Sequence, residues 1–491
     1  MAAAAEPNNL HFVLFPLMAQ GHMIPMVDIA RILANHGATV TIFTTPLLAN
    51  QLNCMITRAT ESNLKIRLLE LQLPLAEAGL PEGFEIFDKV PPSDAKVKFF
   101  KAMNLLEQPA EIRLRSLSPY PSCIISDLPF FWTTDVARRL NIPRIVFHGP
   151  GCLYILSRHI LSTTNVLEQI GSDVEPFVLL GLPDLFEVTK RKLLGTTKTL
   201  SDEEKALRER FQEAEKASYG IVVNSFNELE QEYVKELEKV RETKIWCIGP
   251  VSLCNKDNVR DIAERGNKGA INENECLKWL DEQETGSVVY VCLGSLAHVS
   301  CEQAIEVGLG LESMNRPFIW CVRNKDEKLE KWFSEQGFEE RVRDKGLIVH
   351  GWAPQVLILS HRATGGFITH CGWNSTLECV SAGVPMGTWP HFADQFLNET
   401  FIVEILKVGV RIGVEVPEDV EDKTKVLVSK EDVKTVVERL MSDGEDGKQR
   451  RKRVIELAKM AKSAMDEGGS SYNNVLSMIQ DITTYHAIKN R

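Results

Sequence analysis

Two residues of types suited to proton transfer lie near the ends of short apolar runs. His22 comes after LHFVLFP (10–16) and lies at or near the N-terminus of the predicted helix MVDIARILANHG, which Gly37 closes. The partial positive charge of a helix N-terminus disfavours the imidazolium by ~0.3 to 1 kcal/mol, so the ring stays neutral and can accept a proton. Asp127 ends the run CIISD. At the same sheet edge its carboxylate could orient the ring and stabilise the imidazolium formed during a reaction.

Each of these two residues also has a purely structural explanation. A lone histidine in a loop is often a hydrogen-bonded polar group without a chemical role. An aspartate after a strand often caps the next helix, and LPFFWTTDVARRL follows Asp127. A serine or cysteine nucleophile motif such as GxSxG does not accompany the pair. Neither residue alone indicates a chemical role, but His22 and Asp127 together indicate a base and the carboxylate that orients it.

A second group of polar residues crowds the turn in ITHCGWNSTLECVSAGVP (368–385). The pattern predicts a strand, a turn and a helix N-terminus. Free N–H groups at such a terminus bind phosphate without a net positive charge on the protein, which suits a chain of formal charge -11. The turn carries more hydrogen-bonding capacity than turning requires, in His370, Gly372, Trp373, Asn374 and Ser375.

Helix capping is the structural explanation of this turn. Ser375 and Glu378 have the spacing of a capping box, while Gly383 and Pro385 fit the end of the helix. Capping accounts for Ser375 and Glu378, but it leaves the histidine, tryptophan and asparagine of the turn unexplained.

Short apolar runs alternate with segments of helical periodicity along the whole chain. This alternation predicts the strands and helices that position both groups of residues. This alternation is typical of parallel sheets covered on both faces, whose ligands bind beyond the carboxyl ends of the strands. Neither half has a GxGxxG turn after its first strand, which argues against a dinucleotide-binding dehydrogenase. The runs lie at 10–16, 38–44, 123–127, 144–148 and 219–225, and again at 287–295, 316–322, 346–352, 365–370 and 384–390.

The length of 491 residues exceeds the roughly 250 to 300 at which a single core stops growing, so two domains are expected. A polar stretch after Gly249-Pro250 is the predicted linker. We expect an N-terminal Rossmann-like domain over 1–250, the linker over 251–274, a second Rossmann-like domain over 275–465, and a C-terminal helix over 466–491 that returns to the first domain.

Composition and charge exclude several classes of function. The acidic balance argues against a large basic surface for nucleic acid or anionic membranes. The one basic cluster, KQRRKR (448–453), is interpreted as a solvated helix face because Val454, Leu457 and Met460 follow it, the alternative being a targeting or polyanion patch. Eleven cysteines without a CxxC pair are typical of reduced core thiols. With no signal peptide or span of ~18 apolar residues, a cytoplasmic protein is expected.

The segment from Trp352 to Gln395 resembles the signature box of plant family 1 UDP-dependent glycosyltransferases, which act on secondary products. The sequences GHMIPM, SDLPFFWT and CLGS extend the resemblance along the chain. The N-terminal stretch is most similar to the clade that acts on triterpenoids, steroids and phenolics. The resemblance implies the α/β fold called GT-B, in which two facing Rossmann-like doubly wound domains enclose a cleft, with the acceptor mainly in the N-terminal domain and the donor mainly in the C-terminal one.

The resemblance also implies a role for each matching residue. Trp352 would stack on uracil, Ala353 would contact the edge of the base through its backbone, and Gln355 and Glu378 would hold the ribose hydroxyls. Asp394 and Gln395, with the backbone of Trp373, would bind the sugar, where the amide of Gln395 could both donate and accept. His22 and Asp127 match the catalytic pair. The diphosphate would be held in the turn containing Gly372 by Ser295, His370, Asn374 and Ser375.

The box does not cover the acceptor pocket. We expect this pocket to be apolar and suited to a flat or polycyclic compound. The segments 76–87 and 185–200 are expected to line or cover it, together with Phe15, Met18, Leu128, Phe130, Phe131 and Gly149.

The sequence thus predicts an inverting transfer of glucose from UDP-glucose to a hydroxyl of a lipophilic small molecule, a triterpenoid, steroid, flavonoid or other phenolic, giving a β-O-glucoside. No cofactor or metal is expected, because the turn would stabilise the departing diphosphate and no metal-ligand spacing is found. A monomer without nucleic-acid partners is expected. The alternatives are another UDP-sugar as donor and a non-catalytic binder of UDP-sugars or hydrophobic metabolites. The pair His22 and Asp127 favours catalysis, and Gln395 favours glucose.

Overall fold

The computed structural model describes residues 10–91, 94–194, 201–255, 261–262, 265–266, 269–294, 299–323, 326–415 and 426–489. The chain divides into two compact units. The first consists of Met1–Cys152, Thr199–Cys254 and Ser463–Arg491, and the second of Leu153–Lys198 and Asn255–Lys462. The sequence-based boundaries did not anticipate that 153–198 belong to the second unit. Those boundaries stay a prediction.

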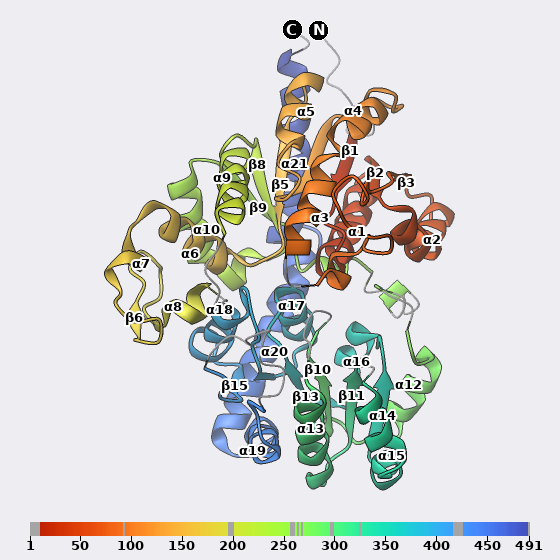
Figure 1. Cartoon of the computed structure of the whole chain (residues 1–491), viewed down its shortest axis with the longest axis vertical. Helices are drawn as coiled ribbons and strands as arrows, with labels where there is room; N and C mark the ends of the chain where they lie inside the picture. The colour runs from red at the N-terminus through yellow and green to blue at the C-terminus, as the bar shows by residue number, and fades with distance from the viewer. Residues whose placement is uncertain are drawn as a thin grey trace. The chain divides into compact units, whose positions relative to one another are not determined.

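The first unit is built on a seven-stranded parallel sheet with the order β3-β2-β1-β4-β5-β8-β9 (Figure 1). The chain runs outward from β1 in one direction and from β4 in the other, so the strand order reverses between these two strands. Such a reversal is where ligands of doubly wound sheets bind. The strands are β1 His11–Phe15, β2 Thr39–Thr44, β3 Ile66–Glu70, β4 Cys123–Asp127, β5 Arg144–His148, β8 Gly220–Val223 and β9 Lys244–Cys247.

Helices of the first unit include the last helix of the chain. In Figure 1 the helix α21 runs alongside β9, where the Asn474 side chain donates to the Cys247 carbonyl at 2.9 Å. The helices are α1 Gln20–Asn35, α2 Pro46–Glu61, α3 Asp94–Asn104, α4 Glu107–Arg115, α5 Thr133–Leu140, α9 Asp202–Lys216, α10 Asn227–Arg241 and α21 Ser470–Lys489, with the short turns η2 Phe87–Lys89 and η3 Val251–Asn255.

Central strands of the first sheet are buried on both faces, as the continuous apolar runs predict. Aromatic rings fill the space beside the end of β1. The ring of Phe15 stacks on Phe43 with centroids 4.3 Å apart and meets Trp132 edge-on at 5.5 Å. This packing fixes the backbone at the carboxyl end of β1, from which the chain enters α1.

The second unit repeats the same plan in a six-stranded parallel sheet with the order β12-β11-β10-β13-β14-β15. Its strand order reverses between β10 and β13. Side chains alternate between faces, so Val289 and Val291 join the core under the helix α13 (Cys301–Ser313), whereas Tyr290 stacks on Phe367 with ring centroids 4.9 Å apart. The strands are β10 Val288–Cys292, β11 Phe318–Val322, β12 Gly346–His350, β13 Thr364–Thr369, β14 Met386–Thr388 and β15 Gly409–Arg411.

The second unit also contains an antiparallel pair of short strands, β6 Phe177–Val178 and β7 Glu187–Val188. Its helices are α6 Cys152–Thr163, α7 Val166–Gln169, α8 Lys190–Leu194, α12 Glu273–Asp281, α13 Cys301–Ser313, α14 Glu327–Ser334, α15 Phe338–Val342, α16 Gln355–Ser360, α17 Trp373–Ala382, α18 Gln395–Thr400, the π-helical turn η4 Phe401–Ile405, α19 Lys430–Leu440 and α20 Glu445–Met465.

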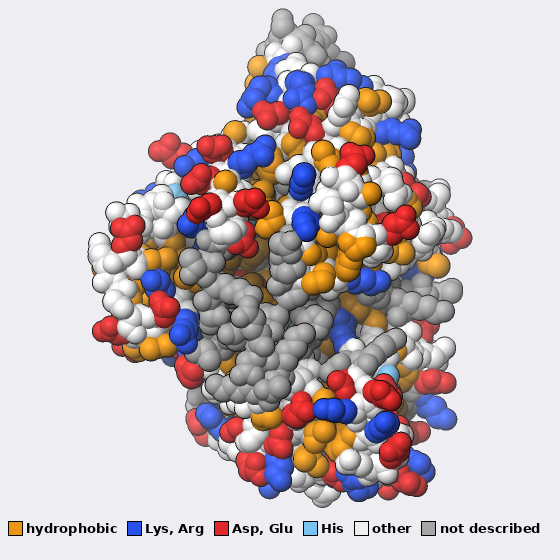
Figure 2. Space-filling model, viewed as in Figure 1, with side chains coloured by type: hydrophobic (Ala, Val, Ile, Leu, Met, Phe, Trp, Pro, Cys, Tyr) orange, Lys and Arg blue, Asp and Glu red, His pale blue; other side chains and the backbone are white. Residues whose placement is uncertain are grey.

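The basic cluster 448–453 lies on α20, as predicted, but the apolar stripe that follows it was placed wrongly. Val454 is fully buried, whereas Met460 is 45% exposed. The buried face of the helix continues instead through Ala458 and Ala461. Both are small residues, which permit close packing. Figure 2 shows acidic and basic side chains interspersed over the face that it displays.

Cysteine burial agrees with the prediction of core thiols at most positions. All eleven are free, and nine of them are buried. Cys54 is exposed and Cys254 is partly exposed. Among the helices of the described ranges, none combines the length and the apolar character needed to cross a membrane.

Candidate active site

His22 and Asp127 meet at the strand reversal of the first sheet. β1 and β4 pair in parallel with Phe15 opposite Ser126, so Asp127 emerges beside the chain that leaves β1. Helix α1 begins at Gln20 after the N-cap Ala19, six residues before the predicted start at Met26, so His22 lies inside its first turn. The His22 Nδ1 lies 2.8 Å from the Asp127 Oδ1.

This hydrogen bond decides which imidazole nitrogen can act as a base. The Asp127 side chain is nearly completely buried, while that of His22 is 31% exposed. A buried carboxylate accepts a hydrogen bond from Nδ1–H and so fixes the tautomer whose basic nitrogen is Nε2. The same carboxylate would stabilise the imidazolium once Nε2 has taken a proton.

The structural explanation of Asp127 as a helix cap is wrong. The following helix α5 has Trp132 at its N-cap and no side-chain cap. The second carboxylate oxygen of Asp127 instead accepts a hydrogen bond from the backbone N–H of Leu17 at 2.6 Å. Asp127 therefore ties the loop after β1 to the end of β4 and holds the histidine at the same time.

Gly149 completes this part of the site from the next strand. It follows β5, and a β-carbon at Gly149 would lie 3.4 Å from the Cε1 of His22. A larger residue would press against the imidazole ring. The ends of three adjacent strands, β1, β4 and β5, thus supply the histidine, the carboxylate and the space for the ring.

The residues predicted to line the acceptor pocket differ in how deeply they are buried. Phe15 and Phe130 are almost completely buried in the core cluster of the first unit. Met18 and Phe131 are also buried, whereas Leu128 is partly exposed. The Met18 carbonyl accepts a hydrogen bond from the Phe87 N–H at 2.7 Å, which ties the end of the segment 76–87 to the loop after β1. The role of these residues as pocket lining stays a prediction, and 195–200 lie outside the described residues.

The polar turn of the second unit has the predicted form of strand, turn and helix. α17 follows β13 with Gly372 at its N-cap and ends at Gly383, which has the left-handed φ of 75° suited to glycine. The capping box is absent, since no side chain caps this helix. Ser375 and Glu378 instead bind the side chain of Gln355. Its Nε2 lies 3.0 Å from the Ser375 Oγ and 2.8 Å from the Glu378 Oε2.

A buried ion pair holds the other oxygen of Glu378. The Arg265 guanidinium donates to the Glu378 Oε1, and both side chains are buried. Tyr290 reaches the same network through a contact of 3.4 Å between its hydroxyl and the Gln355 Oε1. The two residues assigned to the ribose are therefore fixed in position by neighbours. Such fixed hydrogen-bonding groups suit a ligand with vicinal hydroxyls.

His370 fits closely between two glycines. A β-carbon at Gly294 would lie 2.5 Å from the His370 Nε2, and one at Gly372 would lie 2.3 Å from it. Burial, with smaller contributions from the nearby His391 and Arg323, lowers the pKa of His370 to about 3. The ring is therefore neutral at pH 7. Its Nδ1 is buried without a hydrogen-bond partner, as is the indole N–H of Trp352.

The residues predicted to bind the sugar show one departure from expectation. The Gln395 Oε1 accepts hydrogen bonds from the backbone N–H groups of His391 at 2.8 Å and Phe392 at 3.1 Å. Both lone pairs are thus committed, and the amide can only donate to a sugar. The Asp394 Oδ2 accepts from the Asn398 Nδ2 at 2.7 Å, and this amide also donates to the Cys371 carbonyl at 2.8 Å.

Sequence reasoning missed four residues of this second part, namely Arg265, Tyr290, Arg323 and Asn398. Tyr290 and Arg323 could have been found as polar groups at or just after the strands β10 and β11. Arg265 and Asn398 carry no such signal. The predicted donor residue Ser295 lies outside the described residues. Across the ranges that the structure describes, no three His, Cys, Asp or Glu side chains gather as a metal site would require.

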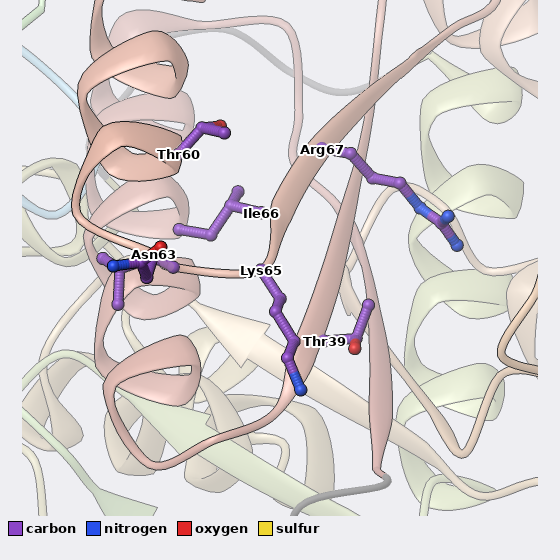
Figure 3. A pocket seen from close by; sticks show the side chains of 7 residues that line it. Thr39, Thr60, Asn63, Lys65, Ile66 and Arg67 are labelled. Atoms are coloured by element: carbon purple, nitrogen blue, oxygen red, sulfur yellow. The ribbon is translucent and has the colours of Figure 1, made fainter.

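A shallow hollow in the first unit is separate from the histidine pair (Figure 3). It lies at the amino ends of β2 and β3, the opposite edge of the parallel sheet from His22 and Asp127. Its wall is made by Thr39, Thr60, Asn63, Leu64, Lys65, Ile66 and Arg67, without a carboxylate or imidazole.

Comparisons with known proteins identify the family. Residues 219–459 match the family model described as UDP-glucoronosyl and UDP-glucosyl transferase. UDP-glycosyltransferase 73E1 of Stevia rebaudiana is 65% identical over 484 residues, which cover 98% of this chain and 97% of that protein. The chain belongs to the plant UDP-glycosyltransferases. It is therefore a glycosyltransferase that uses a UDP-sugar.

Solved structures of this glycosyltransferase family agree with the two sheets. Glycyrrhiza uralensis UGT73P12, complexed with glycyrrhetinic acid 3-O-monoglucuronide, superposes with a TM-score of 0.89 at 33% identity over 98% of this chain and 97% of that one. Phytolacca americana UGT2, complexed with UDP-2fluoro-glucose and pterostilbene, gives 0.77 at 27% identity over 97% and 100%. The predicted GT-B fold class with two Rossmann-like domains is confirmed. The non-catalytic alternative is left without support.

Proposed function

We propose that this glycosyltransferase moves glucose from UDP-glucose to a hydroxyl of a lipophilic small molecule with inversion at the anomeric carbon. The Nε2 of His22 takes the acceptor proton as the hydroxyl oxygen bonds to the anomeric carbon. The bond from that carbon to the diphosphate breaks on the opposite face, and UDP leaves with the electron pair. The product is a β-O-glucoside, and Asp127 stabilises the imidazolium formed in the step.

The observation that carries this proposal is the hydrogen bond of 2.8 Å between His22 and a buried carboxylate. It supplies a base of defined tautomer at the edge where doubly wound sheets bind ligands. No nucleophilic side chain is needed, because direct attack by the acceptor gives the inverted product in one step.

The donor assignment is supported by the second unit. The Gln355, Ser375 and Glu378 network suits a ribose, and the neutral His370 among backbone N–H groups at the start of α17 suits a diphosphate. The amide of Gln395 can donate to sugar hydroxyls, while Asp394 can accept. Stabilisation of the leaving diphosphate by these groups leads us to propose that no metal is required, and EDTA should leave the rate unchanged.

Glucose is the proposed sugar, because Gln395 presents a neutral donor to the hexose and closes a box that resembles those of glucose-using relatives. An epimer that leaves a buried polar group unpaired loses ~1 to 3 kcal/mol. We expect at least tenfold preference for UDP-glucose over UDP-galactose and UDP-glucuronic acid when the three compete at equal concentration. A majority of galactoside or glucuronide would overturn the glucose assignment and leave the role of His22 standing.

The acceptor class is proposed from the apolar residues around His22 and from the compounds bound to the two solved relatives, a glycyrrhetinic acid glucuronide and pterostilbene. Triterpenoids, steroids, flavonoids and simple phenols are the classes to test. Mass spectrometry of products from a mixed panel identifies the acceptor, and exclusive transfer to polar acceptors such as free sugars would overturn the lipophilic assignment. A cytoplasmic monomer is also proposed, which fractionation and size-exclusion chromatography would test.

A further inference from the structure

Arg323 is the first residue after β11, at the carboxyl edge of the second sheet. β11 pairs in parallel with β12, where Val322 lies opposite His350. Arg323 therefore leaves the sheet beside the chain that leads to Trp352. Its guanidinium carbon lies 4.7 Å from the centroid of the Trp352 ring. A guanidinium over an indole face is held there by a cation–π interaction.

The alternation of side chains puts Arg323 on the face of the sheet that carries the donor residues. Trp320 and Val322 point into the core under α13. Cys321, two residues before Arg323, points the other way, and its Sγ lies 3.5 Å from the Tyr290 hydroxyl. That hydroxyl contacts Gln355 at 3.4 Å. Arg323 thus lies on the same side as the residues assigned to the ribose.

The charge of Arg323 reaches the phosphate turn as well. Arg323 is one of the groups that lower the pKa of His370 to about 3, after burial and His391. It also contributes to the lowered pKa of Cys292, behind the hydrogen bond from Cys321. The guanidinium therefore lies close to the residue assigned to the base and acts electrostatically on a residue assigned to the diphosphate.

Within the part of the chain that the structure describes, Arg323 has no carboxylate partner, and its Nε is buried without a hydrogen bond. Two other arginines of this unit differ. Arg265 pairs with Glu378, and Arg411 pairs with Glu399 and Glu404. A partly buried cation without a counter-charge is unfavourable unless an anion joins it. This unpaired charge is the observation that points to a ligand.

We propose that Arg323 is the positive counter-charge for the diphosphate of the UDP-sugar, which it contacts while stacked on Trp352. The inference rests on the donor site of the proposed function. The planar guanidinium can donate two parallel hydrogen bonds to phosphate oxygens, and stacking on one face of Trp352 leaves the other face for the base. In a chain of formal charge -11, Arg323 and the start of α17 together supply the local attraction that a dianionic diphosphate requires.

The test compares ligands that differ only in phosphate. Uridine, UMP and UDP are titrated by calorimetry, without acceptor, against the wild type, Arg323→Gln and Arg323→Lys. Arg316→Gln is the matched control, because Arg316 lies just before the amino end of the same strand. We expect Arg323→Gln to weaken UDP binding at least tenfold and uridine binding less than threefold. Arg323→Lys should lose less than Arg323→Gln, since it keeps the charge but not the planar fork. Arg316→Gln should bind all three as the wild type does.

Two results would overturn the proposal. UDP affinity within threefold of the wild type in Arg323→Gln would show that the charge is not used. An equal loss for uridine and UDP would mean that Arg323 only orders Trp352. If Arg323→Gln does not fold, Arg323→Met, which also removes the charge, carries the same comparison.

Failure of the donor site itself is measured separately. Trp352→Ala should weaken uridine, and His370→Ala should weaken UDP more than uridine. If neither variant alters binding while Arg323→Gln still weakens UDP, the assigned donor site is wrong but the anion-binding role of Arg323 stands. The identity of the transferred sugar does not enter this experiment, because none of the titrated ligands contains a hexose.

Discussion

Replacing Asp127 by asparagine tests the base most directly, because it removes one charge and keeps the shape. Asp127 makes two contacts, with the Leu17 N–H at 2.6 Å and the His22 Nδ1 at 2.8 Å. The asparagine oxygen can satisfy only one of them. If it keeps the Leu17 N–H, its NH₂ faces Nδ1, and the imidazole proton must move to Nε2. The nitrogen assigned as the base is then blocked.

The size of the effect follows from these two contacts. Loss of a charge-assisted hydrogen bond to the imidazolium removes about 1.5 to 3 kcal/mol of stabilisation. To restore the tautomer with a basic Nε2, the asparagine amide must rotate so that its oxygen faces the His22 Nδ1. The buried Leu17 N–H then has no acceptor, which costs a further ~1 to 3 kcal/mol. At about 1.4 kcal/mol per factor of ten, the two together lower turnover by roughly 10² to 10⁴.

The assay is turnover, followed as UDP release with saturating donor and acceptor, together with UDP affinity by calorimetry. Asp127→Asn should lose turnover and keep its UDP affinity, and His22→Ala should lose at least as much turnover. Asp135→Asn is the control, because this exposed carboxylate on α5 pairs with Arg138 at the surface. Retention of more than one tenth of wild-type turnover by Asp127→Asn, with an unchanged pH profile, would refute the base assignment.

Two further predictions concern the second unit. His370→Ala and Asn374→Ala should weaken UDP binding, measured by calorimetry, by more than they reduce the thermal stability of the ligand-free protein, measured by thermal melts. A larger loss of stability than of UDP binding would mean that the turn has only a structural role. Glu399 has its pKa raised from 4.5 to about 7 by burial, against opposing effects of Thr388 and Arg411. The unfolded chain then releases this proton near pH 4.5 and the folded chain near pH 7, so stability falls as pH rises between these values, by roughly 3 kcal/mol. Chemical denaturation at pH 5 and pH 8 should show a smaller fall in Glu399→Gln, and parallel losses in the variant and the wild type would contradict the assignment.

Strand ends made the histidine pair predictable. The runs LHFVLFP and CIISD fix where β1 and β4 end, and the reversal of strand order brings those ends together. No pattern in either segment reports that the second oxygen of Asp127 binds Leu17, because this contact depends on how the chain leaves β1. The same limit explains why helix capping of Asp127 was a reasonable but wrong alternative.

The residues assigned to the donor were found through the box, but their partners in the structure could not be found from the sequence. Glu378 pairs with Arg265, which is 113 residues away in the chain and comes from a polar stretch without apolar periodicity. The Gln395 oxygen is committed to backbone N–H groups, which no side-chain pattern reveals. Buried phenylalanines such as Phe15 were predicted by residue type alone, since type does not distinguish a pocket wall from the core beneath it.

The two glycines around His370 set a limit on how this enzyme can be altered by mutation. Alanine at 294 or 372 brings a methyl carbon to within 2.5 or 2.3 Å of the imidazole, and Gly294 also has a left-handed φ of 84°. Saturation libraries at these two positions should therefore return glycine almost alone among active clones. Directed evolution of donor choice therefore has no freedom at these two positions.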